Sequence, residues 1–273
     1  MTYREIYRRL SSAGIDNADT DAALLLEHFC GVSRASLPFR RDEDFSSPAL
    51  AEAVKRRESR CPLQYILGRW GFCGLEFYTA PGVLIPRADT ELIATAAINA
   101  LPPGARIADL GCGSGCIGIT VLHARPDVTC TSVDISPAAL ELTQKNAGRY
   151  GLGNRLRLLE GNMLEQSTWQ ALGRLTAVIS NPPYIPHSQL AGLAPELAFE
   201  PAEALDGGSD GLDFYRILIS RGAASLDSQG FILFECGTGQ SADISALGKA
   251  AGLEPQVLYD IEKRDRAVML RRE

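Results

Sequence analysis

The chain has 273 residues, of which 45% are hydrophobic and 22% are charged. These proportions are ordinary for folded globular proteins and exclude a long disordered chain. The formal net charge of −6 argues against a protein whose whole surface binds nucleic acid, because phosphates are neutralised by clustered Lys and Arg. Basic residues do crowd the N-terminal part, where a solvated helix surface is favoured over a face for RNA or an acidic partner.

Cysteine and histidine follow no pattern that binds metal or forms a redox pair. The seven cysteines include no Cys-x-x-Cys pair, and the three histidines lie far apart in the sequence. The N-terminal residues are charged, unlike a secretory signal, and no apolar run reaches the length of a membrane span. We therefore expect a cytoplasmic protein with reduced thiols, no metal and no membrane contact.

Helical patterns fill the first part of the chain. Thr2 can cap a first helix, apolar residues recur on one face of residues 18–30, and Pro48 opens a third helix. Residues 1–63 are therefore predicted to form a small helical bundle. Residues 64–86 change character, because glycines interrupt aromatic and β-branched residues, and this pattern predicts a β-hairpin linker.

Strand and helix patterns alternate through the rest of the chain, residues 87–273. Strands are expected at residues 105–110, 128–133, 155–159, 177–180, 231–235, 255–259 and 267–270. Helices are expected at residues 89–100, 115–124, 137–150, 211–224 and 240–251. Such alternation requires crossover connections, so it predicts a doubly wound α/β unit with a mainly parallel sheet.

Glycines gather where the first of these strands ends. The segment reads Asp109-Leu-Gly111-Cys112-Gly113-Ser114-Gly115. Glycines at such a turn let the backbone approach a ligand, and the N–H groups of a helix N-terminus attract an anion. The anion can be an NAD pyrophosphate or a methionine carboxylate, because Gly113 and Gly118 fit the dinucleotide fingerprint and Asp134 has the spacing of a ribose-binding acid. A turn that only packs helix on strand is the third interpretation.

A second polar corner follows the strand at residues 177–180, where the sequence reads Asn181-Pro182-Pro183-Tyr184. The two prolines fix φ and remove two donors, so nearby carbonyl groups stay free to accept hydrogen bonds. Asn181 adds a side-chain carbonyl, and Tyr184 adds a flat apolar face. Such a corner suits a planar –NH2 group, whereas a lone Pro-Pro is more often only a rigid turn.

Methylation of an amide or an aromatic amine requires a corner of this kind, because the nitrogen lone pair is delocalised. Acceptors that hold both N–H bonds localise the lone pair and aim it at a sulfonium methyl group. They also stabilise the positive charge that grows on nitrogen, so no strong general base is needed. An NAD enzyme has no use for this clamp, and the two corners together favour a methyltransferase.

Asn-Pro-Pro-Tyr after such a glycine loop resembles two groups of class I methyltransferases, which act on adenine N6 in DNA or RNA and on glutamine amides. Other segments are similar to the release factor glutamine methyltransferases of the HemK/PrmC type. These segments are Pro62-Leu-Gln64-Tyr65-Ile66-Leu-Gly68, Gly82-Val-Leu-Ile-Pro86-Arg87-Ala-Asp-Thr90-Glu91, Phe199-Glu200-Pro201, Gly207-Gly208-x-x-Gly211, Glu235-x-Gly237-x-x-Gln240 and Asp265-Arg266. The likeness extends from Pro62 nearly to the end of the chain.

This resemblance implies a class I methyltransferase fold with a seven-stranded sheet in residues 87–273, a linker at 64–86 and a substrate-docking bundle at 1–63. It implies methyl transfer from S-adenosylmethionine to N5 of the glutamine in the Gly-Gly-Gln motif of peptide chain release factors, in support of translation termination. S-adenosylhomocysteine would be the product. The release factor would be the partner of a monomeric enzyme that has no direct nucleic-acid substrate.

The motifs and the resemblance together assign roles to individual residues. The expected catalytic residues are Asn181, Pro182 and Tyr184. The expected cofactor-binding residues are Asp109, Gly111, Cys112, Gly113, Ser114, Gly115, Asp134, Ile135, Asn162, Met163 and Asn181. The expected substrate-binding residues are Asn181, Pro182, Pro183, Tyr184, Arg87 and Glu91. The chain departs from the family at Ala88 and Asp89, where Pro and Glu are usual, and at Asn162, where Asp is common.

Three alternatives are kept beside this hypothesis. A ribosomal-protein glutamine methyltransferase would use the same clamp and differ only in its docking surface. An N6-adenine methyltransferase would hold a flipped base against Tyr184 and needs a basic cleft. A nucleotide-binding scaffold would use the glycine loop and would leave the Asn-Pro-Pro-Tyr corner unexplained.

Overall fold

The computed structural model describes residues 1–272, and the chain divides into two compact units. The helical unit comprises Met1–Arg69 together with Ala194–Phe199, and the sheet unit comprises Trp70–Leu193 together with Glu200–Glu273. The sequence did not predict that a short segment from within the sheet-forming region belongs to the helical unit. Within the described residues, no helix has the length and apolar character needed to cross a membrane.

The helical unit confirms the three predicted helices and adds two short ones. Its helices are α1 (Tyr3–Ser12), α2 (Ala18–Cys30), α3 (Leu37–Arg40), α4 (Pro48–Glu58) and α5 (Leu63–Leu67). Thr2 and Glu5 form a capping box at the start of α1, and the Ser47 hydroxyl accepts from the Leu50 N–H at the start of α4. These caps satisfy N–H groups that have no partner inside the helix.

The predicted hairpin linker begins later than the sequence suggested. Residues 63–67 form α5, which ends at Gly68 in the left-handed conformation, so this glycine closes a helix and does not belong to a β-turn. The hairpin follows as β1 (Arg69–Phe72) and β2 (Leu75–Tyr78). Phe72 and Phe77 are buried, with ring centroids 6.0 Å apart.

Buried charges tie the inserted segment into the helical unit. The Arg57 guanidinium lies 2.7 Å from the Asp21 carboxylate and 3.0 Å from the Glu196 carboxylate, and Arg60 lies 2.8 Å from Glu196. The side chains of Arg57 and Asp21 are each 9% exposed. Because a buried charge without its partner is costly, this network fixes α2, α4 and the segment that carries Glu196 in one arrangement.

The sheet unit confirms the predicted doubly wound architecture, with seven strands in the order β5-β4-β3-β6-β7-β9-β8. The strands are β3 (Arg106–Leu110), β4 (Thr129–Asp134), β5 (Leu156–Glu160), β6 (Leu175–Ser180), β7 (Leu226–Glu235), β8 (Glu254–Tyr259) and β9 (Asp265–Arg271). The strand β9 pairs antiparallel with β7 and with β8, and the other pairings in this sheet are parallel.

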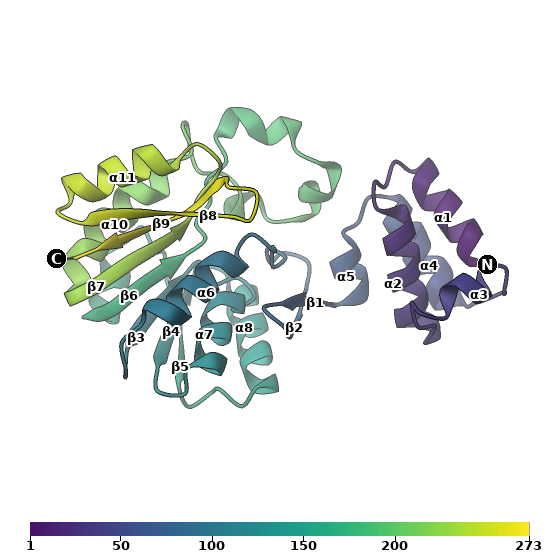
Figure 1. Cartoon of the computed structure of the whole chain (residues 1–273), viewed down its shortest axis with the longest axis horizontal. Helices are drawn as coiled ribbons and strands as arrows, with labels where there is room; N and C mark the ends of the chain where they lie inside the picture. The colour runs from purple at the N-terminus through teal and green to yellow at the C-terminus, as the bar shows by residue number, and fades with distance from the viewer. Residues whose placement is uncertain (273) are drawn as a thin grey trace. The chain divides into compact units, whose positions relative to one another are not determined.

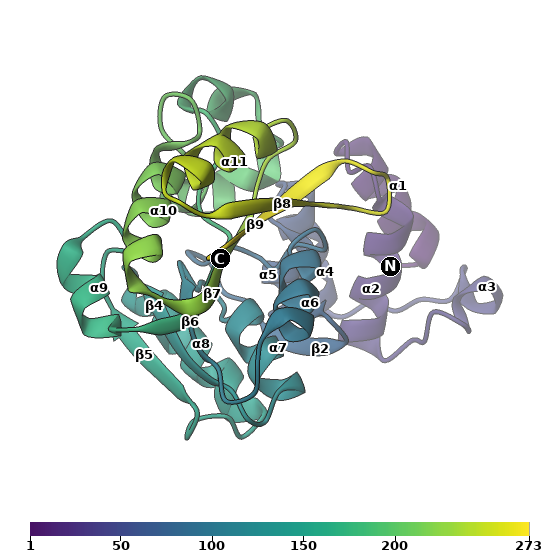
Figure 2. The same ribbon diagram turned by 60° about the vertical axis from the view of Figure 1, so that its left-hand side comes forward.

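Helices cover both faces of this sheet (Figures 1 and 2). They are α6 (Glu91–Ala100), α7 (Cys116–Ala124), α8 (Pro137–Arg149), α9 (Gln166–Leu172), α10 (Asp213–Ser225) and α11 (Ser241–Ala250). Short 3-10 helices lie at His187–Gly192 and Ala202–Ala204 of this unit, and a third, Pro195–Phe199, belongs to the helical unit. One apolar core joins α6, α7 and α8 to one face, and a second joins α9, α10 and α11 to the other. The result is a three-layer unit.

The direction in which successive strands are added to the sheet reverses between β3 and β6. From β3 the chain proceeds outward to β4 and β5, and from β6 it proceeds the other way to β7. Leu110 at the end of β3 pairs with Ser180 at the end of β6, and the Ser180 hydroxyl donates to the Leu110 carbonyl at 2.7 Å. The segments that leave these two strands therefore share the crevice where open α/β sheets bind ligands.

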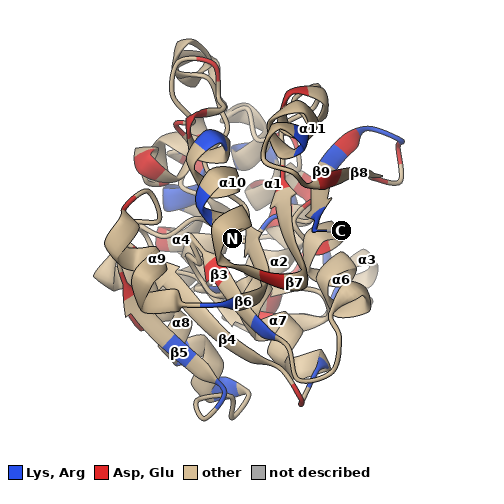
Figure 3. Cartoon of the chain, turned by 90° about the vertical axis from the view of Figure 1, so that its left-hand side faces the viewer, with Lys and Arg blue, Asp and Glu red and all other residues tan. Residues whose placement is uncertain are grey.

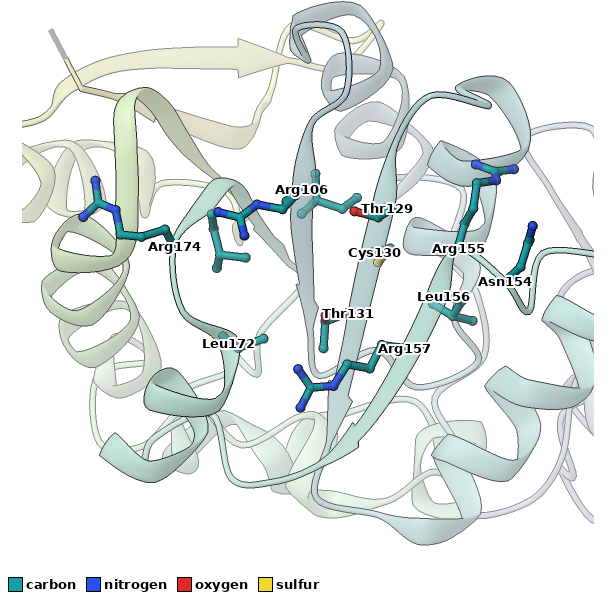
Figure 4. A pocket seen from close by; sticks show the side chains of 12 residues that line it. Arg106, Thr129, Cys130, Thr131, Asn154, Arg155, Leu156, Arg157, Leu172 and Arg174 are labelled. Atoms are coloured by element: carbon teal, nitrogen blue, oxygen red, sulfur yellow. The ribbon is translucent and has the colours of Figure 1, made fainter.

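Arginines line the opposite, amino-terminal edge of the sheet. Figure 3 shows a basic residue on β5 and another just before β6, within an otherwise mixed distribution of charge. Figure 4 shows Arg106, Arg157 and Arg174 around a hollow, which has a volume of about 340 Å³. Arg155, Arg157 and Arg174 donate to carbonyl groups near the ends of α7, α9 and α10. These contacts satisfy helix C-termini, so the arginines stabilise the fold.

Replacement of Arg57 by Ala should destabilise the helical unit, because it strips Asp21 and Glu196 of their shared partner. We expect a loss of about 3 kcal/mol, the usual cost of breaking a buried pair. Hydrogen exchange of α2 and α4 amides in the full chain measures the change. Arg40→Ala removes an exposed pair with Glu43 and is the matched control, with little expected effect. Equal protection in both variants would contradict a structural role for the network.

Candidate active site

A hollow of about 530 Å³ opens where β3, β4 and β6 end. It brings together several segments that lie far apart in the sequence. They contribute residues 82–87, Thr90, residues 111–114, Cys116, Ile117, residues 134–136, Ala139, residues 161–164, Asn181, Pro183, Pro201, Glu203, Ala204 and Phe214. Most of the predicted cofactor and substrate residues therefore line one cavity.

The glycine loop has a backbone that side chains would disturb. Gly111, Gly113 and Gly115 all have positive φ, at 67°, 56° and 76°. A Cβ at Gly115 would lie 2.7 Å from the Thr143 side chain of α8, so only glycine fits there. Gly115 itself does not line the hollow; it brings the loop against α8 and starts α7.

Two acids that the sequence grouped as cofactor residues have different environments. The Asp134 carboxylate, at the end of β4, accepts from the backbone N–H groups of Gly113 and Ser136, both at 2.9 Å, and lines the hollow. Asp109 is fully buried, and one of its oxygens accepts from Gly118 N–H at 3.0 Å. Its other oxygen has no hydrogen-bond partner among the described residues. Burial raises the pKa of Asp109 to about 7.

Three more of the predicted cofactor-binding residues, Ile135, Asn162 and Met163, line the same cavity. Ile135 is 64% exposed at its rim, and Met163 packs beneath Gly111, where an added Cβ would come within 3.0 Å of the Met163 methyl group. The Asn162 side-chain oxygen accepts from the Leu164 N–H at 2.9 Å and so shapes a turn. A carbonyl oxygen has two lone pairs, so this oxygen can accept a second hydrogen bond.

The Asn-Pro-Pro-Tyr corner follows β6 directly. Asn181 and Pro183 line the hollow, whereas Pro182 and Tyr184 do not. The Asn181 amide nitrogen donates to the Thr90 hydroxyl at 3.1 Å. The Tyr184 hydroxyl lies 3.4 Å from the Glu235 carboxylate, so the tyrosine faces β7 and its predicted contact with substrate stays a prediction.

Glycines and Gln240 pack tightly behind this corner. A Cβ at Gly207 would lie 2.7 Å from Tyr184 Cα, and a Cβ at Gly211 would lie 2.4 Å from the Tyr184 carbonyl oxygen. The Gln240 amide donates to that same oxygen at 3.0 Å and accepts from Gly237 N–H at 2.9 Å. In the sequence, Gly207, Gly211, Gly237 and Gln240 stood out only because they resemble segments of the family. In the structure, they hold the backbone of the Asn-Pro-Pro-Tyr corner in place.

The two predicted substrate residues Arg87 and Glu91 have different surroundings in the structure. Arg87 lines the hollow, and its guanidinium pairs with the buried Glu200 carboxylate, which also accepts from Ile85 N–H. Glu91 instead accepts from Cys73 N–H at 2.8 Å at the start of α6 and does not line the hollow. Glu91 therefore anchors the hairpin to α6.

Three polar residues near the site were not assigned roles from the sequence. Asn146 is buried, donates to the Ser114 and Tyr78 carbonyls and accepts from Tyr78 N–H, so it joins the glycine loop to β2. Thr90 and Glu235 are each 2% exposed and lie behind Asn181. The pKa of Glu235 is raised to about 7, mainly by burial and also by Asp89, against the lowering effects of Thr90, Arg266 and Tyr184.

Residues around the hollow are compatible with a nucleoside that carries an amino-acid group. The Asp134 carboxylate suits ribose hydroxyls, and the exposed Ile135 suits the flat face of a base. The N-terminus of α7 attracts a carboxylate, whereas Asp109 is fully buried and does not line the hollow, so its predicted contact with the cofactor stays a prediction.

Comparison with known proteins agrees with the fold. Residues 2–68 match the family described as PrmC N-terminal domain, and residues 75–209 match the family described as Methyltransferase small domain. A ribosomal protein L11 methylase from Lactobacillus delbrueckii subsp. bulgaricus has a similar fold, with a TM-score of 0.52 and 17% identity over 71% of this chain and 84% of that chain. A methyltransferase from Pyrococcus furiosus gives 0.53 and 14% over 73% and 89%.

Curated relatives are similar over nearly the full length. The release factor glutamine methyltransferase of Moorella thermoacetica is 39% identical over 97% of this chain and 95% of its own length. That of Geobacter sulfurreducens is 40% identical over 89% and 85%. Taken with the glycine loop and the Asn-Pro-Pro-Tyr corner, these matches show that the chain belongs to the family of release factor glutamine methyltransferases.

Proposed function

We propose that this enzyme transfers a methyl group from S-adenosylmethionine to the side-chain amide nitrogen of the glutamine in the Gly-Gly-Gln motif of a peptide chain release factor. The observation that carries the proposal is the orientation of Asn181. Its amide nitrogen is engaged by Thr90, and the residue lines the hollow beside the glycine loop. The side-chain oxygen is therefore the end that receives a substrate –NH2 group.

Cofactor binding follows from the residues at the ends of β3, β4 and β5. Asp134 accepts from the ribose hydroxyls, Ile135 and Met163 contact the adenine, and Asn162 accepts from its amino group. The glycine loop, from Gly111 to Gly115, lets the backbone approach the methionine part closely. Bound in this way, S-adenosylmethionine supplies an electrophilic methyl group on a positively charged sulfur.

Catalysis depends on acceptors for the amide N–H bonds. The Asn181 side-chain oxygen and the Pro182 carbonyl accept these bonds, and neither proline offers a competing donor. They hold the nitrogen lone pair in line with the methyl group and stabilise the charge that develops on nitrogen. The N–C bond forms as the C–S bond breaks, and the nitrogen then releases a proton to water.

The choice of a protein substrate is supported by the helical unit and by the relatives. Residues 2–68 match a domain of this family, and the full-length relatives are named for release factor glutamine methylation. We assign the helical unit to docking of the release factor. Such a reaction takes place in the cytoplasm, where the seven free cysteines stay reduced.

A methylation assay tests the proposed substrate. The enzyme is incubated with labelled S-adenosylmethionine and, separately, a purified release factor, a ribosomal-protein mixture or DNA, and the labelled residue is located by mass spectrometry. We expect label on the Gly-Gly-Gln glutamine of the release factor. Label on a ribosomal-protein glutamine would replace the substrate but keep the reaction, and label on adenine would refute the proposal.

Replacement of Asn181 by Ala should lower kcat about a hundredfold or more while S-adenosylmethionine still binds, because an acceptor that acts in the transition state is lost. Single-turnover kinetics and calorimetric titration separate the two effects. Asn154→Ala, on the amino-terminal edge of the sheet, is the matched control and should behave as the wild type. Near-normal turnover of Asn181→Ala would exclude the clamp.

Replacement of Asp134 by Ala should raise the Kd for S-adenosylmethionine at least about tenfold, because hydrogen bonds to a charged acceptor are worth roughly 1.5–3 kcal/mol. The Gly113 N–H also loses its acceptor. Isothermal titration measures the Kd, and Asp127→Ala, which removes an exposed pair with Arg125, is the control. An unchanged Kd would remove Asp134 from the cofactor site.

A further inference from the structure

A line of polar side chains runs from β7 to the hollow. Glu235 ends β7, the Thr90 hydroxyl lies beside its carboxylate, and the Asn181 amide nitrogen donates to that hydroxyl at 3.1 Å. Thr90 and Glu235 are each 2% exposed, so water does not replace these contacts. One Glu235 oxygen faces the Tyr184 hydroxyl at 3.4 Å, and the other is buried without a hydrogen-bond partner among residues 1–272.

The donor and acceptor properties of the three side chains determine the direction of these hydrogen bonds. An ionised carboxylate only accepts, so the Thr90 hydroxyl proton turns toward Glu235. The Thr90 oxygen then presents a lone pair to Asn181, and the amide offers its nitrogen to that lone pair. Its oxygen must consequently face the other way, toward the hollow.

We propose that Thr90 is a positioning residue that fixes the side-chain amide of Asn181 with its oxygen toward the substrate, and that Glu235 keeps Thr90 an acceptor by taking its hydroxyl proton. This inference rests on the proposed methylation of a carboxamide. The reversed Asn181 amide would place an –NH2 group against the substrate –NH2 group. Two donors cannot bond each other, and the clamp would lose one of its acceptors.

The charges around Glu235 allow its ionised form to be populated at neutral pH. Arg266 of β9 favours the carboxylate, whereas Asp89, which precedes α6, opposes it. Tyr184 donates to the carboxylate, and Tyr215 of α10 donates to the Glu235 backbone carbonyl at 2.7 Å. The neighbouring thiols of Cys236 and Cys116 are neutral, because burial raises their pKa to about 12.

Substitution of Thr90 tests the positioning role. Thr90→Val keeps the shape and removes the hydroxyl, so kcat for glutamine methylation should fall about tenfold to a hundredfold at an unchanged Kd for S-adenosylmethionine. Thr90→Ser should restore most of the loss. The control is Thr120→Val, which removes another buried hydroxyl, in α7 and outside the site. It should keep the kcat of the wild type.

A double-mutant cycle separates positioning from folding. If Thr90 acts through Asn181, the variant Thr90→Val with Asn181→Ala should be no slower than Asn181→Ala alone. Losses that multiply, or normal kcat in Thr90→Val, would overturn the inference. The wild-type assay keeps the two proposals apart, since label on adenine refutes the proposed function, whereas a normal Thr90→Val enzyme that labels glutamine refutes only this inference.

The pH dependence of kcat tests the role of Glu235. Because the pKa of Glu235 is raised to about 7, its carboxyl group is protonated at lower pH and can then donate to Thr90 instead of only accepting from it. At saturating cofactor, kcat should therefore rise with pH through about 7 and level off above it. Glu235→Gln cannot titrate and should show a lower kcat without this limb. Persistence of the same limb in Glu235→Gln would assign it to another group, such as Asp109, and exclude Glu235.

Discussion

The parallel pairing of β3 with β6 is the constraint on which the site depends. Leu110 and Ser180 are partners in the register, so the glycine loop and the Asn-Pro-Pro-Tyr corner leave adjacent strands at the same edge. A slip of one residue would turn every side chain of β6 to the opposite face of the sheet. It would also break the hydrogen bond from Ser180 to the Leu110 carbonyl. Sheet topology thus brings together the two segments to which we assign the methyl donor and the methyl acceptor.

Several residues around the site fix the backbone positions of the glycine loop and of the Asn-Pro-Pro-Tyr corner. Gly207 and Gly211 have no Cβ because Tyr184 occupies that space, and Gln240 binds the Tyr184 carbonyl from behind. Asn146 connects the glycine loop to the hairpin. A poor nucleophile gains most from such preorganisation, since the enzyme cannot depend on a strong base. We infer that Thr90 and Glu235 extend this preorganisation to the orientation of the Asn181 side-chain amide.

The sequence predicted the doubly wound sheet, the principal helices and the two corners that follow β3 and β6, because hydrophobic periodicity and glycine and proline corners are local signals. It missed α5, where the glycine that ends the helix looked like a hairpin glycine, and it missed that Ala194–Phe199 joins the helical unit. Glu91 was expected at the substrate, yet its carboxylate caps a backbone N–H of the hairpin. Glu196, Thr90 and Glu235 act through partners distant in sequence, and no local pattern reveals such pairs.

The most direct test of this account is a crystal structure with S-adenosylhomocysteine and a peptide that contains Gly-Gly-Gln. We predict that the glutamine side-chain nitrogen lies within hydrogen-bond distance of the Asn181 side-chain oxygen and the Pro182 carbonyl, and faces the cofactor sulfur. The Asn181 nitrogen should remain on Thr90. A glutamine bound elsewhere, or an Asn181 whose nitrogen faces the peptide, would contradict the account.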